Sequence, residues 1–101
     1  MAKKEKITIS DWNILDHLKT ERDIAEYLNE ALEEGDYDYF LHALGVVAKA
    51  RGINDMAKKI GVTRESLYKS FNGKTRPNFE TVLRAVKNLG LRIRIEQTET
   101  I

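Results

Sequence analysis

A short pattern of small, turn-forming and apolar residues constrains the fold more than any other feature of this chain. Ala57 is followed four positions later by Gly61, then by Val62 and Thr63, and after three further residues by Leu67. A small side chain lets two helices cross closely, a glycine accepts a left-handed turn, and a hydroxyl caps the next helix. The spacing therefore predicts a helix-turn-helix, whose second helix enters a DNA groove while the first braces it. An ordinary helical hairpin is the alternative, but it requires neither the alanine nor the short spacing from cap to anchor.

Helical periodicity on both sides of this motif predicts a mainly α domain of five to six helices. Thr20 and Asp23 have the form of a capping box, which predicts a helix that ends at Gly35. Asp36 begins the next helix, which we expect to run to Gly52. Further helices are expected over residues 54–60, 63–71 and 78–90, with a helical turn over 10–18.

Strand signals occur only near the two ends of the chain. Residues 7–9 alternate apolar and polar, and residues 91–96 alternate strictly, with Leu91, Ile93 and Ile95 on one side. A lone strand leaves its backbone groups unpaired, so the second segment needs a partner. The only other strand candidate is residues 7–9, and the two segments pair either within one subunit or across a dimer. We also expect residues 91–95 to form part of a dimer contact.

The 101 residues are enough for a single domain with one core, in which we expect three parts. These are an acidic helical extension over residues 1–35, a DNA-binding core over 36–90, and a strand and tail over 91–101. The chain has no cysteine, which excludes disulfides, thiolate metal sites and a cysteine nucleophile. It has no apolar run long enough to cross a bilayer, so a cytoplasmic protein without membrane contact is expected.

The net charge of +1 conceals a strong asymmetry along the chain. Residues 7–45 hold two basic and ten acidic side chains, whereas residues 46–95 hold twelve basic and three acidic ones. The second half is therefore suited to meet the phosphates of a nucleic acid, and the first half is repelled by them. Two solvated faces of different charge are the alternative interpretation.

The motif resembles the Xre/Cro/lambda-repressor class of helix-turn-helix domains over residues 40–90. The run MA of residues 56–57, the run GVT of residues 61–63, Leu67 and the run NGKTRP of residues 72–77 carry this resemblance. It implies a lambda-repressor-like domain, to which the predicted short N-terminal strand and C-terminal strand are added. Residues 70–71 depart from the pattern, and Phe71 is predicted to act as a core anchor one turn beyond Leu67.

A closer resemblance, to the probable addiction-module antidote family, spans most of the chain. It rests on LKTE at residues 18–21, ALEEGD at 31–36, and LYK at 67–69 ahead of NG at 72–73. These small prophage-associated proteins are antitoxins of type II toxin-antitoxin modules, paired with HigB-like toxins of the RelE/ParE superfamily. The resemblance implies operator binding with autorepression, and neutralisation of such a toxin by direct contact.

In the helix-turn-helix class, outward residues near the start of the second helix reach base edges. Here these residues are Arg64, Glu65, Ser66 and Lys69. Arg64 or Lys69 is expected to donate to guanine, and Glu65 to accept from the cytosine amino group. The alternative role of Glu65 is a favourable charge in the first turn of its helix.

Phosphate contacts are expected from the end of the preceding helix, from the second helix and from the loop that follows it. The predicted phosphate contacts are Lys49, Arg51, Thr63, Tyr68, Asn72, Lys74, Thr75 and Arg76. For each of them a solvated surface position is the alternative, and Tyr68 has the further alternative of flanking the core. The predicted core of the motif consists of Ala57, Gly61, Val62, Leu67 and Phe71.

The acidic half is suited to a basic partner such as the toxin that the resemblance implies. Candidate steering charges are Glu21, Glu26, Glu30, Glu33, Glu34, Asp36 and Asp38, and candidate anchors are Trp12, Tyr27, Tyr37 and Tyr39. The alternative is that the charges line solvated helix faces and that Trp12 packs on the adjacent core.

Three other functions are alternatives to an antitoxin. A stand-alone prophage or Xre-type repressor without a toxin uses the same DNA chemistry. A nuclease is disfavoured, because His17 and His42 are the only histidines and stand far apart. An adaptor without DNA binding is disfavoured by the presence of Arg64, Lys69 and Lys74. We expect no catalytic residue, metal or cofactor, and a homodimer that binds a palindrome with half-sites ~34–36 Å apart.

Overall fold

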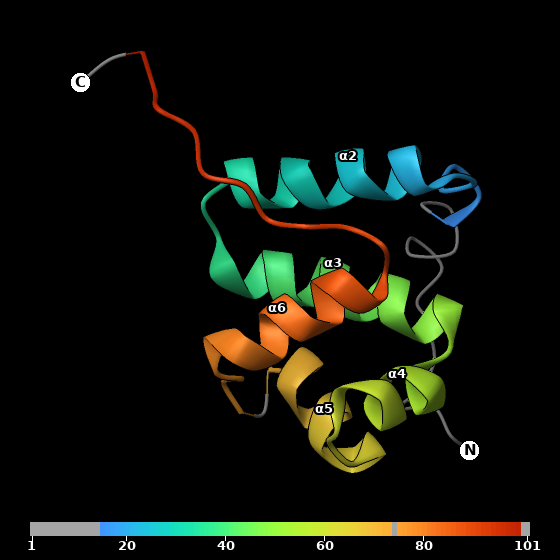
Figure 1. Ribbon diagram of the computed structural model, residues 1–101. Helices are drawn as coiled ribbons and strands as arrows, with labels where there is room; N and C mark the ends of the chain where they lie inside the picture. The colour runs from blue at the N-terminus through green and yellow to red at the C-terminus, as the bar shows by residue number, and fades with distance from the viewer. Residues whose placement is uncertain (1–14, 74, 100–101) are drawn as a thin grey trace.

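The computed structural model describes residues 15–73 and 75–99, and over these residues it contains five α-helices and no β-strand (Figure 1). The helices are α2 (Glu21–Glu33), α3 (Tyr37–Arg51), α4 (Ile53–Ile60), α5 (Arg64–Phe71) and α6 (Phe79–Asn88). The expectation of a mainly helical protein is therefore confirmed. The strand expected over residues 7–9, the turn over 10–14 and the residue Lys74 lie outside the described residues.

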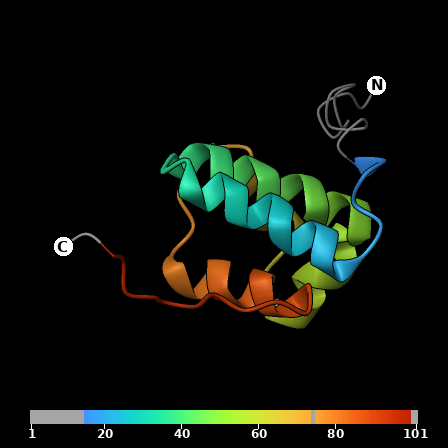
Figure 2. The ribbon, with the colours of Figure 1, turned by 90° about the horizontal axis from the view of Figure 1, so that it is seen from above.

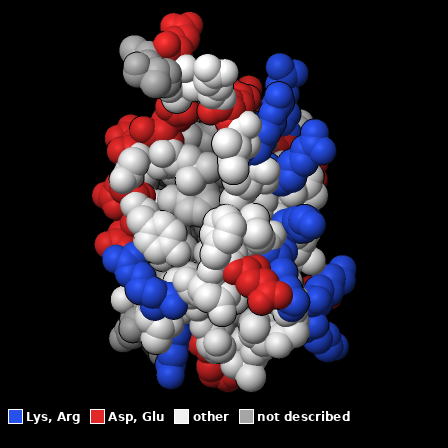
Figure 3. Space-filling view, turned by 60° about the vertical axis from the view of Figure 1, so that its left-hand side comes forward, with Lys and Arg blue, Asp and Glu red and all other residues white. Residues whose placement is uncertain are grey.

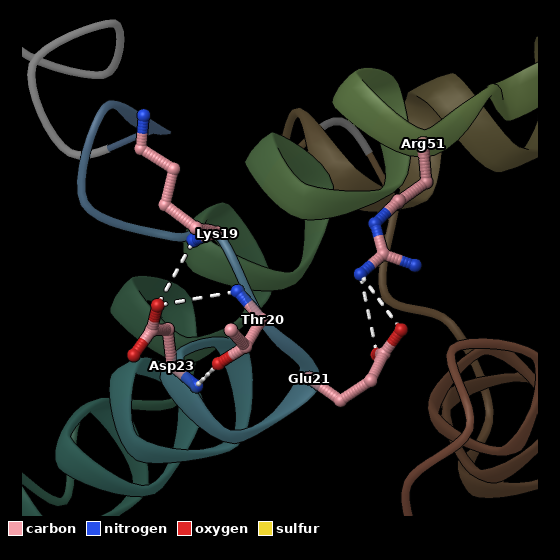
Figure 4. Close-up of polar contacts among 5 residues, drawn as sticks. All are labelled: Lys19, Thr20, Glu21, Asp23 and Arg51. Atoms are coloured by element: carbon pink, nitrogen blue, oxygen red, sulfur yellow. Dashed lines mark hydrogen bonds and ion pairs between the residues drawn. The ribbon is translucent and has the colours of Figure 1, made fainter.

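Helix α2 begins at the predicted capping box (Figure 4). The hydroxyl of Thr20 accepts a hydrogen bond from the backbone N–H of Asp23 at 3.1 Å. In return, the Asp23 carboxylate accepts from the N–H groups of Thr20 and Lys19, at 3.2 and 3.0 Å. These bonds satisfy donors that the first turn of a helix leaves without a partner. The start of α2 is therefore determined by its local sequence.

Helix α3 is the centre of the fold. It packs against α2 on one side and against α4 and α5 on the other, while α6 packs against α4 (Figures 1 and 2). The residues of α3 that these contacts bury are Phe40, Leu41, Ala43, Leu44, Gly45, Val46, Val47 and Ala48. Neighbours on opposite sides therefore bury eight of the fifteen residues of α3, including the unbroken run from Ala43 to Ala48.

Gly45 lets α5 approach α3 closely. A Cβ atom at position 45 would lie 2.8 Å from the Cβ of Phe71, which is closer than real Cβ contacts allow. The Phe71 Cβ is attached directly to the backbone and cannot rotate away. Phe71 is 4% exposed, so it seats α5 against α3 in the interior of the protein.

We predict that Gly45→Ala destabilises the fold by about 1–3 kcal/mol, because the added methyl forces α3 and α5 apart. The free energy of unfolding in urea, followed by circular dichroism, is the measurement. The control is Gly45→Ala on a Phe71→Gly background, where the Cβ atom that the new methyl would meet is absent and alanine's better helix propensity is expected to stabilise. An unchanged or raised stability of the single variant contradicts the contact.

The predicted C-terminal strand is wrong for the single chain. Residues 91–98 belong to no helix or strand. Leu91 still packs on the core, and its N–H donates to the carbonyl of Val86 at 3.2 Å, but Ile95 is 93% exposed. Alternation gives a segment two different faces, but a strand also needs a neighbouring strand to pair with. No strand elsewhere in the described residues provides one.

None of the helices within residues 15–73 and 75–99 is long and apolar enough to span a lipid bilayer.

Candidate nucleic-acid interface

Helices α4 and α5 are joined by the tight turn that the motif predicted. Gly61 has a φ of 83°, a left-handed conformation that a residue with a side chain rarely adopts. The N–H groups of Gly61 and Val62 both donate to the carbonyl of Ala57 at 3.0 Å, which closes the end of α4. Ala57 is 3% exposed and Leu67 is fully buried, so the two helices meet through these side chains. Val62 packs against the same core from the turn.

Thr63 caps α5. Its hydroxyl oxygen accepts from the backbone N–H of Ser66 at 3.0 Å, and its own backbone is extended. The hydroxyl hydrogen is not used by this cap and is available to donate to a phosphate oxygen. Thr63 therefore caps the helix with its oxygen and keeps the O–H donor that a phosphate contact requires.

We predict that Thr63→Ala lowers the free energy of unfolding by about 1 kcal/mol, since the first turn of α5 loses its side-chain acceptor. Thr63→Ser is the matched control and should stay close to the parent protein, because it keeps the oxygen. Thermal and urea unfolding measure both variants. Equal stability of the alanine and serine variants would show that the cap contributes little.

The outward side of α5 is polar. Glu65, Ser66 and Lys69 are exposed, opposite the buried Leu67 and Phe71. Ser70 is the one buried polar side chain of the helix, and its hydroxyl donates to the carbonyl of Ser66 at 3.1 Å. The helix therefore presents a hydrated face rich in hydrogen-bonding groups.

Two cations, Lys49 and Arg64, lie over the ring of Tyr68, and the side-chain amide of Asn72 lies near the Lys49 ammonium. We call these four residues the Tyr68 cluster. The guanidinium carbon of Arg64 lies 4.9 Å from the ring centroid, and the Lys49 Nζ lies 5.4 Å from it. The Lys49 Nζ is also 3.5 Å from the Oδ1 of Asn72. Cation–π contacts orient long side chains that solvent would otherwise leave free. The cluster unites side chains of α3, of α5 and of the residue that follows α5.

Two of the predicted phosphate contacts are held by carboxylates of the acidic half. One Nη of Arg51 lies 3.2 Å from both carboxylate oxygens of Glu21 on α2 (Figure 4). Arg76 lies 2.8 Å from the Oδ1 of Asp38, and its guanidinium carbon is 5.0 Å from the ring of Tyr37. All four charged side chains are at least 40% exposed, so each pair contributes only about 0–1 kcal/mol. A phosphate contact by either arginine requires the exchange of a carboxylate for a phosphate.

The loop after α5 folds back on that helix. Gly73 has a φ of 80°, and the N–H of Thr75 donates to the carbonyl of Lys69 at 3.3 Å. Asn72 and Thr75 are exposed, so both are accessible beside the end of α5.

The sequence interpretation assigned no role to Arg84 or Gly45. Arg84 donates to the carbonyl of Ile60 at 3.0 Å and forms a 2.7 Å ion pair with Glu80, so it joins α6 to the end of α4. Glu80 and Arg84 are four residues apart on one helix, and this spacing indicates the ion pair between them. Neither the carbonyl of Ile60 nor the closeness of α3 to α5 leaves a local signal in the sequence.

No group of three or more histidine, cysteine, aspartate or glutamate side chains within the described part of the chain could hold a metal ion.

Comparison with known proteins identifies the family. The family of probable addiction module antidote proteins matches residues 8–97. The chain is also similar to an uncharacterized protein of Haemophilus influenzae (strain ATCC 51907 / DSM 11121 / KW20 / Rd), with 38% identity over 90 residues, 89% of this chain and 93% of that protein. No solved structure matches significantly.

The chain belongs to the probable addiction module antidote family. It is therefore an antitoxin of a toxin-antitoxin module and has a toxin as its partner. Membership in this family points to a regulatory rather than a catalytic protein.

Proposed function

We propose that this antitoxin binds operator DNA as an Xre/lambda-repressor-like helix-turn-helix protein and represses its own operon. The observation that carries the proposal is the Tyr68 cluster beside the polar face of α5. An aromatic ring holds two cations at the edge of a short, capped helix, where a helix lying in the major groove meets the DNA backbone. Oriented cations lose less conformational entropy on binding phosphate or base than free ones.

The side chains of α5 divide into two roles in this proposal. Arg64 and Lys69 donate to guanine, Glu65 accepts from cytosine, and Ser66 hydrogen-bonds to either kind of base edge. Phosphates are held around them by Lys49, Thr63, Tyr68, Asn72, Lys74 and Thr75, and by Arg51 and Arg76 once they exchange their carboxylates. A two-fold dimer presents two such helices to the half-sites of a palindrome, ~34–36 Å apart.

We expect Arg64→Ala/Lys69→Ala to abolish the preference of the protein for its own promoter. Each lost base contact costs about 1–3 kcal/mol of discrimination, whereas Lys49→Ala should weaken binding to all sequences alike and lower its salt dependence. Fluorescence titration of the promoter and of a scrambled duplex at two salt concentrations measures both effects. Arg22→Ala is the control, because it removes an exposed arginine from α2 rather than from α5. Equal binding of parent and double variant to the promoter contradicts the proposed role of α5.

We further propose that α2 contacts the toxin, which is of the RelE/ParE type. A groove of about 590 Å³ runs along this helix, and its lining includes Leu18, Tyr27, Glu26, Glu30 and Glu33. Carboxylates beside an aromatic and an aliphatic side chain are suited to a basic surface with apolar anchors.

Glu26→Lys/Asn29→Lys/Glu30→Lys, which changes three residues that line the groove, should lose toxin neutralisation while promoter binding stays intact, since the charge of the groove is reversed and α5 is unchanged. Growth during co-expression with the toxin gene of the same operon, and co-purification of the two proteins, provide the measurement. The reciprocal control is Arg64→Ala/Lys69→Ala, which should still neutralise. If the triple variant protects cells as well as the parent, the toxin binds elsewhere. If no such toxin gene exists, the stand-alone repressor is the better description.

A further inference from the structure

The exposed large hydrophobic side chains of the described chain come from the ends of three helices and from the C-terminal segment. We call them the end patch: Leu32, Tyr37, Tyr39, Phe79, Ile93 and Ile95. The end of α2, the start of α3 and the start of α6 lie toward the left in Figures 1 and 2, and the C-terminal segment runs from the end of α6 across to that side. Phe79 is 67% and Ile95 93% exposed. Contiguous apolar surface of this kind marks an interaction site in a protein that stays in solution.

Opposite charges flank the end patch. Figure 3, in which this end of the molecule is turned toward the viewer, shows a largely uncharged centre with one acidic group low in it, acidic side chains along the upper left edge and basic ones along the right edge. Glu33 and Glu34 directly follow Leu32 of the patch, whereas Arg92 and Arg94 alternate with its isoleucines. All four charged side chains are exposed.

We infer that the end patch packs against the end patch of a second copy of this chain, around a two-fold axis that is vertical in Figure 3. A rotation about this axis turns the left edge of one copy onto the right edge of its partner. The acidic flank of each copy then faces the basic flank of the other. A horizontal two-fold axis would instead set acid against acid and base against base. The charge pattern therefore selects both the partner and the axis.

The same axis places the two α5 helices on one side of the dimer. In Figure 1, α5 lies at the lower side of the molecule, and a vertical axis through the left end keeps both copies of α5 there. A palindromic operator requires this arrangement, because both recognition helices must reach one face of the DNA. In this respect the inference rests on the proposed function and names the contact that forms its dimer.

The dimer also accounts for the alternation of residues 91–96. Leu91 is occupied by the core of its own chain, whereas Ile93 and Ile95 extend the same face into solvent. In the dimer these two isoleucines cover the partner's end patch, whereas the intervening arginines lie on the other side of the segment, where their charges act on the partner's acidic flank from the rim of the contact.

Sedimentation equilibrium without DNA, at low and high salt, tests the charge pattern with two complementary variants. Glu33→Lys/Glu34→Lys makes the acidic flank more basic, and Arg92→Glu/Arg94→Glu makes the basic flank more acidic. Each variant alone is expected to dimerise about tenfold more weakly than the parent, because like charges meet twice. An equimolar mixture should recover dimer, since every flank then faces its opposite. Weakening without recovery in the mixture, or no weakening, overturns the inferred axis.

Phe79→Glu and Ile95→Glu test the apolar contact, with Asn29→Glu on α2 as the control for an added charge. The first two should be monomeric at concentrations where the parent and the control are dimeric, and circular dichroism should show all of them folded. A monomeric parent, or dimeric patch variants, overturns the inference. Promoter binding is assayed separately, so loss of the dimer contact and loss of DNA recognition give different results.

Discussion

The approach of α5 to α3 is the constraint on which the rest of the structure depends. Phe71 enters the interior only because Gly45 has no side chain, and the pair seats the second helix of the motif against the central helix. With Phe71 and Leu67 buried, the polar residues of α5 necessarily face outward. The same packing places Tyr68 beside the end of α3, where the Lys49 Nζ lies over its ring. Core packing thus determines which side chains form the candidate DNA-binding surface.

In the described part of the chain, two exposed ion pairs join the acidic and basic halves. Glu21 holds Arg51, and Asp38 holds Arg76, so carboxylates occupy two arginines that the sequence assigns to phosphate. Each pair is weak in water, and a DNA phosphate competes with the carboxylate on comparable terms. Packing between α2 and α3, rather than these pairs, holds the acidic half in place.

Because the charges are separated, different parts of the protein surface suit different partners. In our proposals α5 meets DNA, the acidic groove along α2 meets the toxin, and the end patch meets a second copy. The three surfaces centre on different parts of the fold, and the groove and the end patch share only the end of α2, where Glu33 lines the groove and follows Leu32 of the patch.

The starts of α2 and α5 were predictable because their causes are local. Thr20 and Thr63 each accept a hydrogen bond from an N–H three residues later, and this pattern is visible in the sequence. The turn at Gly61 was predictable for the same reason, because a left-handed φ favours glycine. The candidate base-reading residues also followed from the sequence, because buried residues on a helix define the opposite face.

The C-terminal segment and the candidate phosphate contacts show where local reasoning stops. Alternation over residues 91–96 indicates two faces, but whether a strand forms depends on a distant segment to pair with. Likewise, Lys49 and Arg51 are neighbours on α3, yet one meets Tyr68 and the other meets Glu21. The sequence by itself determined the helices, their caps and the charge of each half, because those depend on residues a few positions apart. Only the tertiary structure decided which cations gather and which are paired, because that depends on which helices pack together.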